Sequence, residues 1–388
     1  MSDHDPLRFA ADLSAKLATR SRHVCAFLGA GVSRACGLPD VDQLQEQVLA
    51  RLDSDDRDAF AAALDGRNLE QALSRLRRIA ALLTEEQDLD GITAERAVAL
   101  DAAVCRAIVE ALDLTDAALD PVLGLAAWVA RADYHLPLEL FTVNHDLLLE
   151  TALERFRVPY FDGFAGTLRA SFQTELVEAT PGSAEEWVPA FFARLWKLHG
   201  SVNWAWEEAQ QIVRLGQPVA EGTPAAIYPS DTKYQESRRV PFVVLQDRLR
   251  HALHHPETLV LISGYSFSDD HLNELLFGAA ARRERSELIA FCYSNIPPTL
   301  ADQAAVTPNL QVMADTEAIL GGVRAEWTVP EDPPPDLWQD GRLGLCDFRR
   351  LAAYLARSAM REPERDPLLR ELLERALPEP DSDASADG

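Results

Sequence analysis

The stretch VCAFLGAG, residues 24–31, decides how this chain folds. Its first five residues form an uninterrupted apolar run, which Gly29-Ala30-Gly31 brings to an end. A short apolar run that stops at glycines is typical of a buried strand followed by a tight turn. We therefore expect a buried strand over residues 24–28, with the chain turning sharply at its carboxyl end.

Similar apolar runs recur farther along the chain, and helical stretches precede or follow several of them. They lie at residues 138–143, 195–198, 258–262, 287–293 and 310–313. Alternation of buried strands with helices predicts a mostly parallel sheet that is covered by helices on both faces. The expected fold class is therefore α/β.

The remaining regions have different patterns. Residues 41–131 carry apolar residues at helical spacing almost throughout, which predicts a helical insertion or subdomain. It would divide the sheet-forming domain into residues 1–40 and 132–322. We expect a linker and C-terminal helices at 323–376 and a disordered acidic tail at 377–388.

Composition restricts the partners and the compartment. The formal net charge of −25 would on average repel a polyanion, so we expect no direct binding to nucleic acid. No apolar run reaches the length of a membrane span, and the N-terminus lacks the apolar centre of an export signal. The five cysteines are odd in number and form no CxxC pair, which argues against a disulfide framework and a four-cysteine zinc site. A cytoplasmic protein is expected.

Polar side chains follow several of the predicted strands. Asn144 and Asp146 come after the run at 138–143, His199 comes after the next run, and Gly264 and Ser266 follow a later one. In an open α/β sheet, ligands sit beyond the carboxyl ends of the strands. Glycine turns and hydroxyl groups suit phosphate or ribose, and an imidazole can act as a base near neutral pH.

Each of these motifs also has a structural explanation when it is taken alone. Gly29-Ala30-Gly31 could simply turn the chain into a helix, and Asn144 or Asp146 could cap the helix that follows. A solitary histidine such as His199 is more often structural than catalytic. Residues Asp40 to Gln43 resemble a capping box that opens a helix. Only the succession of polar strand ends favours a ligand site.

Together the strand ends resemble the sirtuin superfamily, in which Gly-Ala-Gly-x-Ser, Asn-x-Asp, His-Gly and a late Gly-x-Ser occur in this order. The resemblance covers residues 24–40 and 138–313, and it implies a Rossmann-like NAD-binding domain. The wording GAGVS, KLHGS and GYSFSD is closer to the zinc-free sirtuin-like proteins of bacterial anti-phage defence. Those proteins hydrolyse NAD⁺ and thereby starve the infected cell.

The resemblance implies a role for each motif residue. Asn144 would lie near the ribose or the attacking water, and His199 would be the general base. Ser33 and Asp146 would line the nicotinamide pocket, and the backbone at Ala30 would lie near the diphosphate. The full set of implied NAD-binding residues is Gly29, Ala30, Gly31, Ser33, Asp40, Asp146, Gly264, Ser266 and Asn295.

The chain also departs from the sirtuin pattern. Val143 replaces a glutamine, His145 replaces an aliphatic residue, and the cysteine quartet that binds structural zinc in protein-deacylating sirtuins is absent. We therefore expect hydrolysis of NAD⁺ to nicotinamide and ADP-ribose by a triggered effector, without zinc. Protein deacylation and non-catalytic sensing of NAD⁺ or ADP-ribose are the alternatives. By resemblance, the expected partners are further copies of the chain and a HerA-like ATPase or an Argonaute-type protein.

Overall fold

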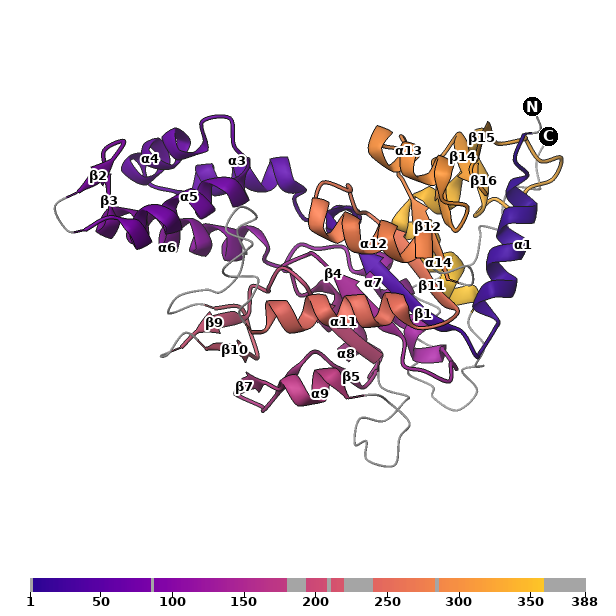
Figure 1. The fold of residues 1–388 in the computed structure, drawn as a ribbon, viewed down its shortest axis with the longest axis horizontal. Coiled ribbons are helices and arrows are strands. Elements are labelled where there is room, and N and C mark those ends of the chain that lie inside the picture. The colour runs from indigo at the N-terminus through magenta and orange to yellow at the C-terminus, as the bar shows by residue number, and fades with distance from the viewer. Residues whose placement is uncertain are drawn as a thin grey trace, which may run out of the picture.

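A large sheet forms the centre of the molecule in the computed structural model (Figure 1). The model describes residues 3–84, 87–179, 193–207, 211–219, 240–282 and 286–358. Within these residues the sheet has nine strands in the order β15-β14-β13-β12-β11-β1-β4-β8-β5. Neighbours from β13 to β5 are parallel, and β14 and β15 extend the sheet in antiparallel fashion. The predicted α/β fold class, with a Rossmann-like and mostly parallel sheet, is confirmed.

The strands of this sheet are short. In chain order they are β1 (His23–Leu28), β4 (Glu139–Thr142), β5 (Tyr160–Phe161), β8 (Ala193–Lys197), β11 (Thr258–Ser263), β12 (Glu287–Phe291), β13 (Leu310–Met313), β14 (Glu317–Leu320) and β15 (Val323–Glu326).

Strand β1 lies between β4 and β11, and every residue of β1 is buried. Its last residue, Leu28, pairs with Thr142 of β4 on one side and with Ser263 of β11 on the other. The chain first continues from β1 to β4 and only later returns to the opposite flank of β1 at β11. This reversal of strand order is the position at which open α/β sheets bind ligands.

Helices cover both faces of the sheet, as the alternation of side chains along β1 requires. Val24, Ala26 and Leu28 point into one hydrophobic cluster, whereas Cys25 and Phe27 point into another. The helices that contribute to the first cluster are α1 (Pro6–Leu17), α2 (Ala30–Ala35), α7 (Asp120–Arg131), α8 (Leu148–Arg155) and α14 (Phe348–Arg357). Those of the second are α9 (Thr174–Glu178), α11 (Phe242–His254), α12 (Asp270–Arg282) and α13 (Pro298–Val306).

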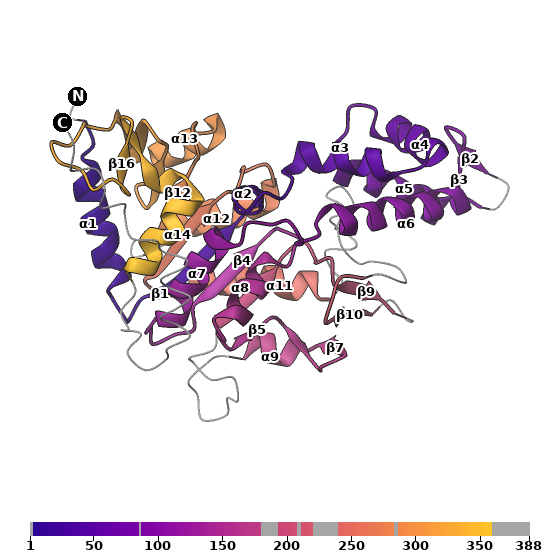
Figure 2. The same ribbon diagram turned by 180° about the vertical axis from the view of Figure 1, so that it is seen from behind.

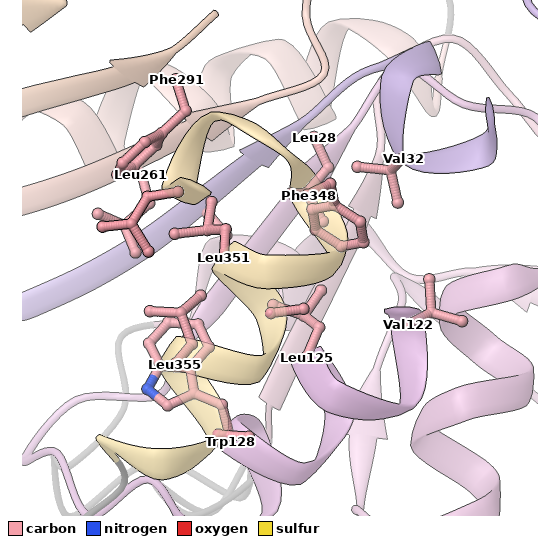
Figure 3. Close-up of a cluster of buried hydrophobic side chains, with 14 of the residues drawn as sticks. Leu28, Val32, Val122, Leu125, Trp128, Leu261, Phe291, Phe348, Leu351 and Leu355 are labelled. Carbon is pink, nitrogen blue, oxygen red and sulfur yellow. The ribbon is translucent and has the colours of Figure 1, made fainter. Parts of the chain in front are cut away.

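The C-terminal helix α14 belongs to the core of the sheet (Figure 3). Its apolar side chains lie against Leu125 and Trp128 of α7, beside Leu261 of the sheet. Two short strands and a 3-10 helix precede it: β16 (Trp338–Gln339), β17 (Arg342–Leu343) and η2 (Gly344–Cys346). The C-terminal helices predicted beyond residue 358 and the tail predicted at 377–388 lie outside the described residues.

Four helices of the predicted insertion form a unit of their own at one side of the sheet (Figures 1 and 2). This helical unit consists of α3 (Val41–Arg51), α4 (Ser54–Leu64), α5 (Leu69–Leu82) and α6 (Ala94–Ala111), with the hairpin β2 (Asp88–Leu89) and β3 (Ile92–Thr93). Its hydrophobic cluster also includes Val202 and, at its margin, Leu147 from the sheet domain. Helix α7, although it falls in the same predicted segment, packs on the sheet.

A second, small sheet is formed by strands that come before and after β8 in the sequence. Its order is β6-β7-β10-β9, all antiparallel. The strands are β6 (Phe164–Ala165), β7 (Arg169–Phe172), β9 (Trp204–Trp206) and β10 (Ile212–Leu215). No helix within the described residues has both the length and the apolar character that crossing a membrane requires.

Candidate active site

Four loops leave the sheet at one edge, because parallel strands end together. We call this the carboxyl edge: the edge at which β1, β4, β8 and β11 end. The residues that close these strands, Leu28, Thr142, Lys197 and Ser263, are paired in register across the sheet. The loops that follow carry most of the polar residues singled out by the sequence.

The glycines after β1 and β11 hold two of these loops in direct contact. Gly31 donates its amide to the carbonyl oxygen of Gly264 at 2.8 Å. A Cβ atom on Gly29 would lie 2.5 Å from that same oxygen, and one on Gly31 would lie 2.6 Å from the Cα of Gly264. Gly264 itself has a φ of +67°, which side chains disfavour. Glycine is therefore required here by the approach of the loops, and Gly29 also precedes the first turn of α2.

Asn144 ties the loop after β4 to the loop after β1. Its Nδ2 donates to the carbonyl oxygen of Gly29 at 2.9 Å, and its backbone amide donates to Oγ1 of Thr142 at 3.0 Å. The side chain is buried, with 9% of its surface exposed. Of the two residues considered as helix caps, Asp146 lies one residue before the N-cap Leu147 of α8, and its Oδ1 accepts the amide of Leu148 at 3.0 Å.

Asp146 also joins α2 to the same loop. Ser33 donates its hydroxyl to Oδ2 of Asp146 at 2.5 Å, and both side chains are buried. A hydrogen bond to a carboxylate is about twice as strong as one between neutral groups. Gly29, Gly31, Ser33, Asn144, Asp146 and Gly264 are thus connected by direct contacts across three loops.

His199 pairs with a residue that we did not single out from the sequence. Its Nε2 lies 3.3 Å from Oδ2 of Asp269, and the two side chains keep 17% and 13% of their surface exposed. Asp269 also begins α12, because its Oδ1 accepts the amides of His271 and Leu272 at 3.0 and 3.2 Å. An aspartate just before a helix has an ordinary capping role, so nothing in the sequence links Asp269 to His199.

Lys197 stabilises the loop after β4 through hydrogen bonds. Its Nζ donates to the carbonyl oxygen of Asp146 and to Oε1 of Glu150 on α8, the latter at 2.9 Å. Lys197 is buried, and burial raises the pKa of Glu150 although the lysine opposes the rise. Sequence reasoning also missed this pair, whose only signal was the position of Lys197 beside His199.

His145 places a neutral imidazole close to His199. Burial lowers the pKa of His145 to about 3, and the nearby charges of His199 and Lys197 lower it further. Its carbonyl oxygen accepts the amide of Val202 at 2.9 Å. His145, which stands where sirtuins have an aliphatic residue, therefore connects the loops after β4 and β8.

Three other predicted residues have more local contacts. Asp40 opens α3 with a capping box to Gln43, as its sequence suggested. Ser266 is exposed, with its Oγ 2.9 Å from Oγ of Ser268. Asn295 is exposed in the loop after β12, two strands from β1.

The described part of the chain contains no group of metal ligands. There, no cluster of three or more His, Cys, Asp or Glu side chains could hold a metal ion. All five cysteines are buried as free thiols on different elements.

Comparison with known families points to the same region of the chain. Residues 138–311 match the model of the SIR2-like domain, which supports a sirtuin-like family and indicates NAD-related activity. The matched part runs from β4 into β13 and includes the loops with Asn144, His199 and Gly264. It leaves out the helical unit, α14 and the Gly29 loop, although that loop contacts the matched region directly. No curated protein matches the chain.

Proposed function

We propose that this protein hydrolyses NAD⁺ to nicotinamide and ADP-ribose, as a triggered effector that depletes NAD⁺ in anti-phage defence. One observation carries the proposal: the buried amide of Asn144 and the Asp-paired imidazole of His199 follow adjacent parallel strands within the SIR2-like region. Both lie at the edge where open α/β sheets bind dinucleotides.

Cleavage of NAD⁺ breaks the bond between C1′ of the ribose and the nicotinamide nitrogen, through a transition state that resembles a ribosyl cation. The enzyme has to hold the nicotinamide, shield the cation and deliver water. In this proposal Ser33 and Asp146 hold the carboxamide of nicotinamide, Asn144 positions the water or the ribose hydroxyls, and His199 accepts the proton of the water.

The residues present fit a dinucleotide. The exposed hydroxyls of Ser266 and Ser268 and the exposed Asn295 offer hydrogen bonds to phosphate or ribose beyond β11 and β12. The hydrogen bonds of Asn144 and Asp146 fix these side chains before any ligand arrives, which reduces the entropy that binding must cost. Positioning of this kind suffices when the leaving group is as good as nicotinamide in NAD⁺.

Hydrolysis is favoured over protein deacylation by the cysteines. Deacylating sirtuins carry a four-cysteine zinc module, and the five cysteines of this chain are free thiols buried on different elements. The proposal extends to partners by resemblance alone: a second polypeptide, such as a HerA-like ATPase or an Argonaute-type protein, would switch on a homo-oligomer of this chain. Light scattering on the chain with and without each partner tests the assembly.

The central experiment follows nicotinamide and ADP-ribose after NAD⁺ is mixed with the pure protein, alone and with candidate partners. We expect Asn144→Ala and His199→Ala each to lower the rate by about 10²- to 10⁴-fold. His251→Ala, which removes an exposed histidine of α11, is the matched control and should leave the rate unchanged.

Two further measurements separate the alternatives. Turnover of an acyl-lysine peptide in step with NAD⁺ loss would replace hydrolysis by deacylation. Calorimetric binding of NAD⁺ or ADP-ribose without any product, in every partner mixture, would make the protein a sensor. Full activity in both Asn144→Ala and His199→Ala would refute the site.

A further inference from the structure

Asp269 uses its two carboxylate oxygens for two different purposes. Oδ1 accepts the amides of His271 and Leu272 at the start of α12, and Oδ2 lies 3.3 Å from Nε2 of His199. The amides at a helix start favour negative charge, and α12 has 13 residues. The two hydrogen bonds from these backbone amides also restrict rotation of the carboxylate, so Oδ2 stays directed toward His199.

Hydrogen bonds among the residues around Asp269 hold the loop between β11 and α12 in place. The hydroxyl of Tyr265 lies 3.3 Å from the carbonyl oxygen of Asp269 and 3.1 Å from Oδ1 of Asn273, and it can donate to either. Asn273 in turn donates Nδ2 to the carbonyl oxygen of Phe267 at 2.8 Å. Phe267 has a φ of +57°, a strained value for a residue other than glycine. Backbone strain of this kind persists where the surroundings impose it, and it clusters at functional sites.

We propose that Asp269 is a positioning residue that fixes the tautomer and orientation of His199. With Nε2 facing a carboxylate, the proton of the neutral ring sits on Nε2, and Nδ1 is left unprotonated. Nδ1 is then the atom that acts as the general base. This inference rests on the proposed hydrolysis of NAD⁺ and assigns the base to one atom.

The oxygen of water bonds to C1′ as the bond between C1′ and the nicotinamide nitrogen breaks, and the electron pair of that bond leaves with nicotinamide. The proton of water passes to Nδ1 of His199, and solvent later removes it. While the ring carries both protons, Oδ2 of Asp269 stabilises its positive charge.

The other ionisable groups near His199 do not replace Asp269. His145, from the loop after β4, stays neutral through the working range because burial and its charged neighbours lower its pKa to about 3. Lys197, at the end of β8, is engaged elsewhere, because its Nζ pairs with Oε1 of Glu150 at 2.9 Å. Asp269, at the start of α12, therefore supplies the anion that favours the protonated ring.

The test compares Asp269→Asn with Asp270→Asn. Asparagine is as good a helix cap as aspartate, so Asp269→Asn keeps the shape and the cap but removes the charge that faces His199. Asp270 is the next residue, exposed in the first turn of α12, and its substitution removes the same charge from the same helix start. Asp269→Ser is a second variant that keeps a capping oxygen, in case the asparagine variant does not fold.

We expect Asp269→Asn to lower kcat by about 10²- to 10⁴-fold, with KM nearly unchanged. Asp270→Asn should match the wild type in both respects. Nitrogen NMR of histidine-labelled protein, with His199→Ala to assign the signal, should show the proton on Nε2 in the wild type and a changed tautomer in Asp269→Asn.

The tautomer of His199 and the formation of ADP-ribose test the positioning role and the proposed hydrolysis separately. If Asp269→Asn and Asp269→Ser keep the wild-type tautomer of His199 and the kcat of Asp270→Asn, Asp269 is only a helix cap and the inference is wrong. If the tautomer depends on Asp269 while no condition yields ADP-ribose, the positioning role stands and the proposed hydrolysis falls.

Discussion

The two edges of the central sheet place polar groups in opposite ways. At the amino edge, where β1 and β4 begin, Glu139 is 1% exposed and both of its oxygens are fully engaged. They accept hydrogen bonds from Nε1 of Trp196 at 2.6 Å, from Nε of Arg248 at 2.8 Å and from Nε2 of His23 at 2.9 Å. Both oxygens of Glu139 are used within the cluster, so the carboxylate is not available to bind a ligand.

At the carboxyl edge, the loops after β8 and β11 carry polar side chains that keep part of their surface exposed. His199 is fastened through Nε2 and keeps part of its ring exposed, and Ser266 is exposed beyond β11. A polar strand end is therefore not itself the mark of a site. What distinguishes the carboxyl edge is that His199 is held in place by Asp269 while part of its side chain stays exposed.

The largest effect should come from breaking the amino edge. Glu139→Ala leaves Arg248 and His23 without their carboxylate, and we expect a loss of about 3–5 kcal/mol in the free energy of unfolding. Glu287→Ala is the control, since Glu287 begins β12 and pairs with Lys16 and Arg22 while 22% of its side chain stays exposed. Its loss should stay below about 1 kcal/mol. Denaturant unfolding measures both, and equal losses would contradict the contrast between buried and surface pairs.

A smaller effect should come from the support of the carboxyl edge. Lys197→Met removes the donor to the carbonyl oxygen of Asp146 and leaves Glu150 buried without its cation. We expect a loss of about 2–4 kcal/mol in unfolding free energy, together with slower NAD⁺ hydrolysis because the Asn144 loop loses its anchor. Lys16→Met is the matched control. An active and fully stable Lys197→Met protein would show that the loop after β4 does not need the hydrogen bonds of Lys197.

The smallest effect concerns alkaline pH at the amino edge. Burial disfavours the charged ring of His23, but Cys25 and Glu139 outweigh it and raise the pKa to about 10. A raised pKa stabilises the folded state fully below the unfolded value near 6.5, and this contribution disappears as the pH rises to about 10. The pKa of Glu139 is lowered, so its own contribution is lost only in acid.

We therefore expect the wild type to lose about 1–3 kcal/mol of unfolding free energy between neutral pH and pH 10 through His23. Other groups titrate in this range, so the informative quantity is the difference from His23→Gln, measured by urea unfolding at each pH. Parallel curves for the two proteins would mean that His23 carries no charge in the folded state.

The sequence predicted the fold class because strand burial and helix periodicity are local signals. The run at residues 24–28, its glycine turn and the capping box at Asp40 all appear where they were expected. The roles assigned to Asn144, His199 and the NAD-binding residues stay predictions, since contacts alone do not reveal a reaction. Their tests are the variants described above.

What the sequence did not reveal depends on distant contacts. Asp269 lies far along the chain from His199, and His23 is 116 residues from Glu139. Periodicity also shows which face of a helix is apolar without showing what that face packs against. For this reason α7 and the four helices of the helical unit look alike in sequence, yet α7 joins the core of the sheet.

The shared packing of Val202 and Leu147 has a thermodynamic consequence. Val202 lies three residues after His199, Leu147 directly follows Asp146, and both contribute to the hydrophobic cluster of the helical unit. A molecule that repacks α3 to α6 therefore also perturbs the loops that carry the candidate site. Linkage makes such coupling reciprocal: whatever factor an effector on the helices applies to the affinity for NAD⁺, NAD⁺ applies to the affinity for that effector.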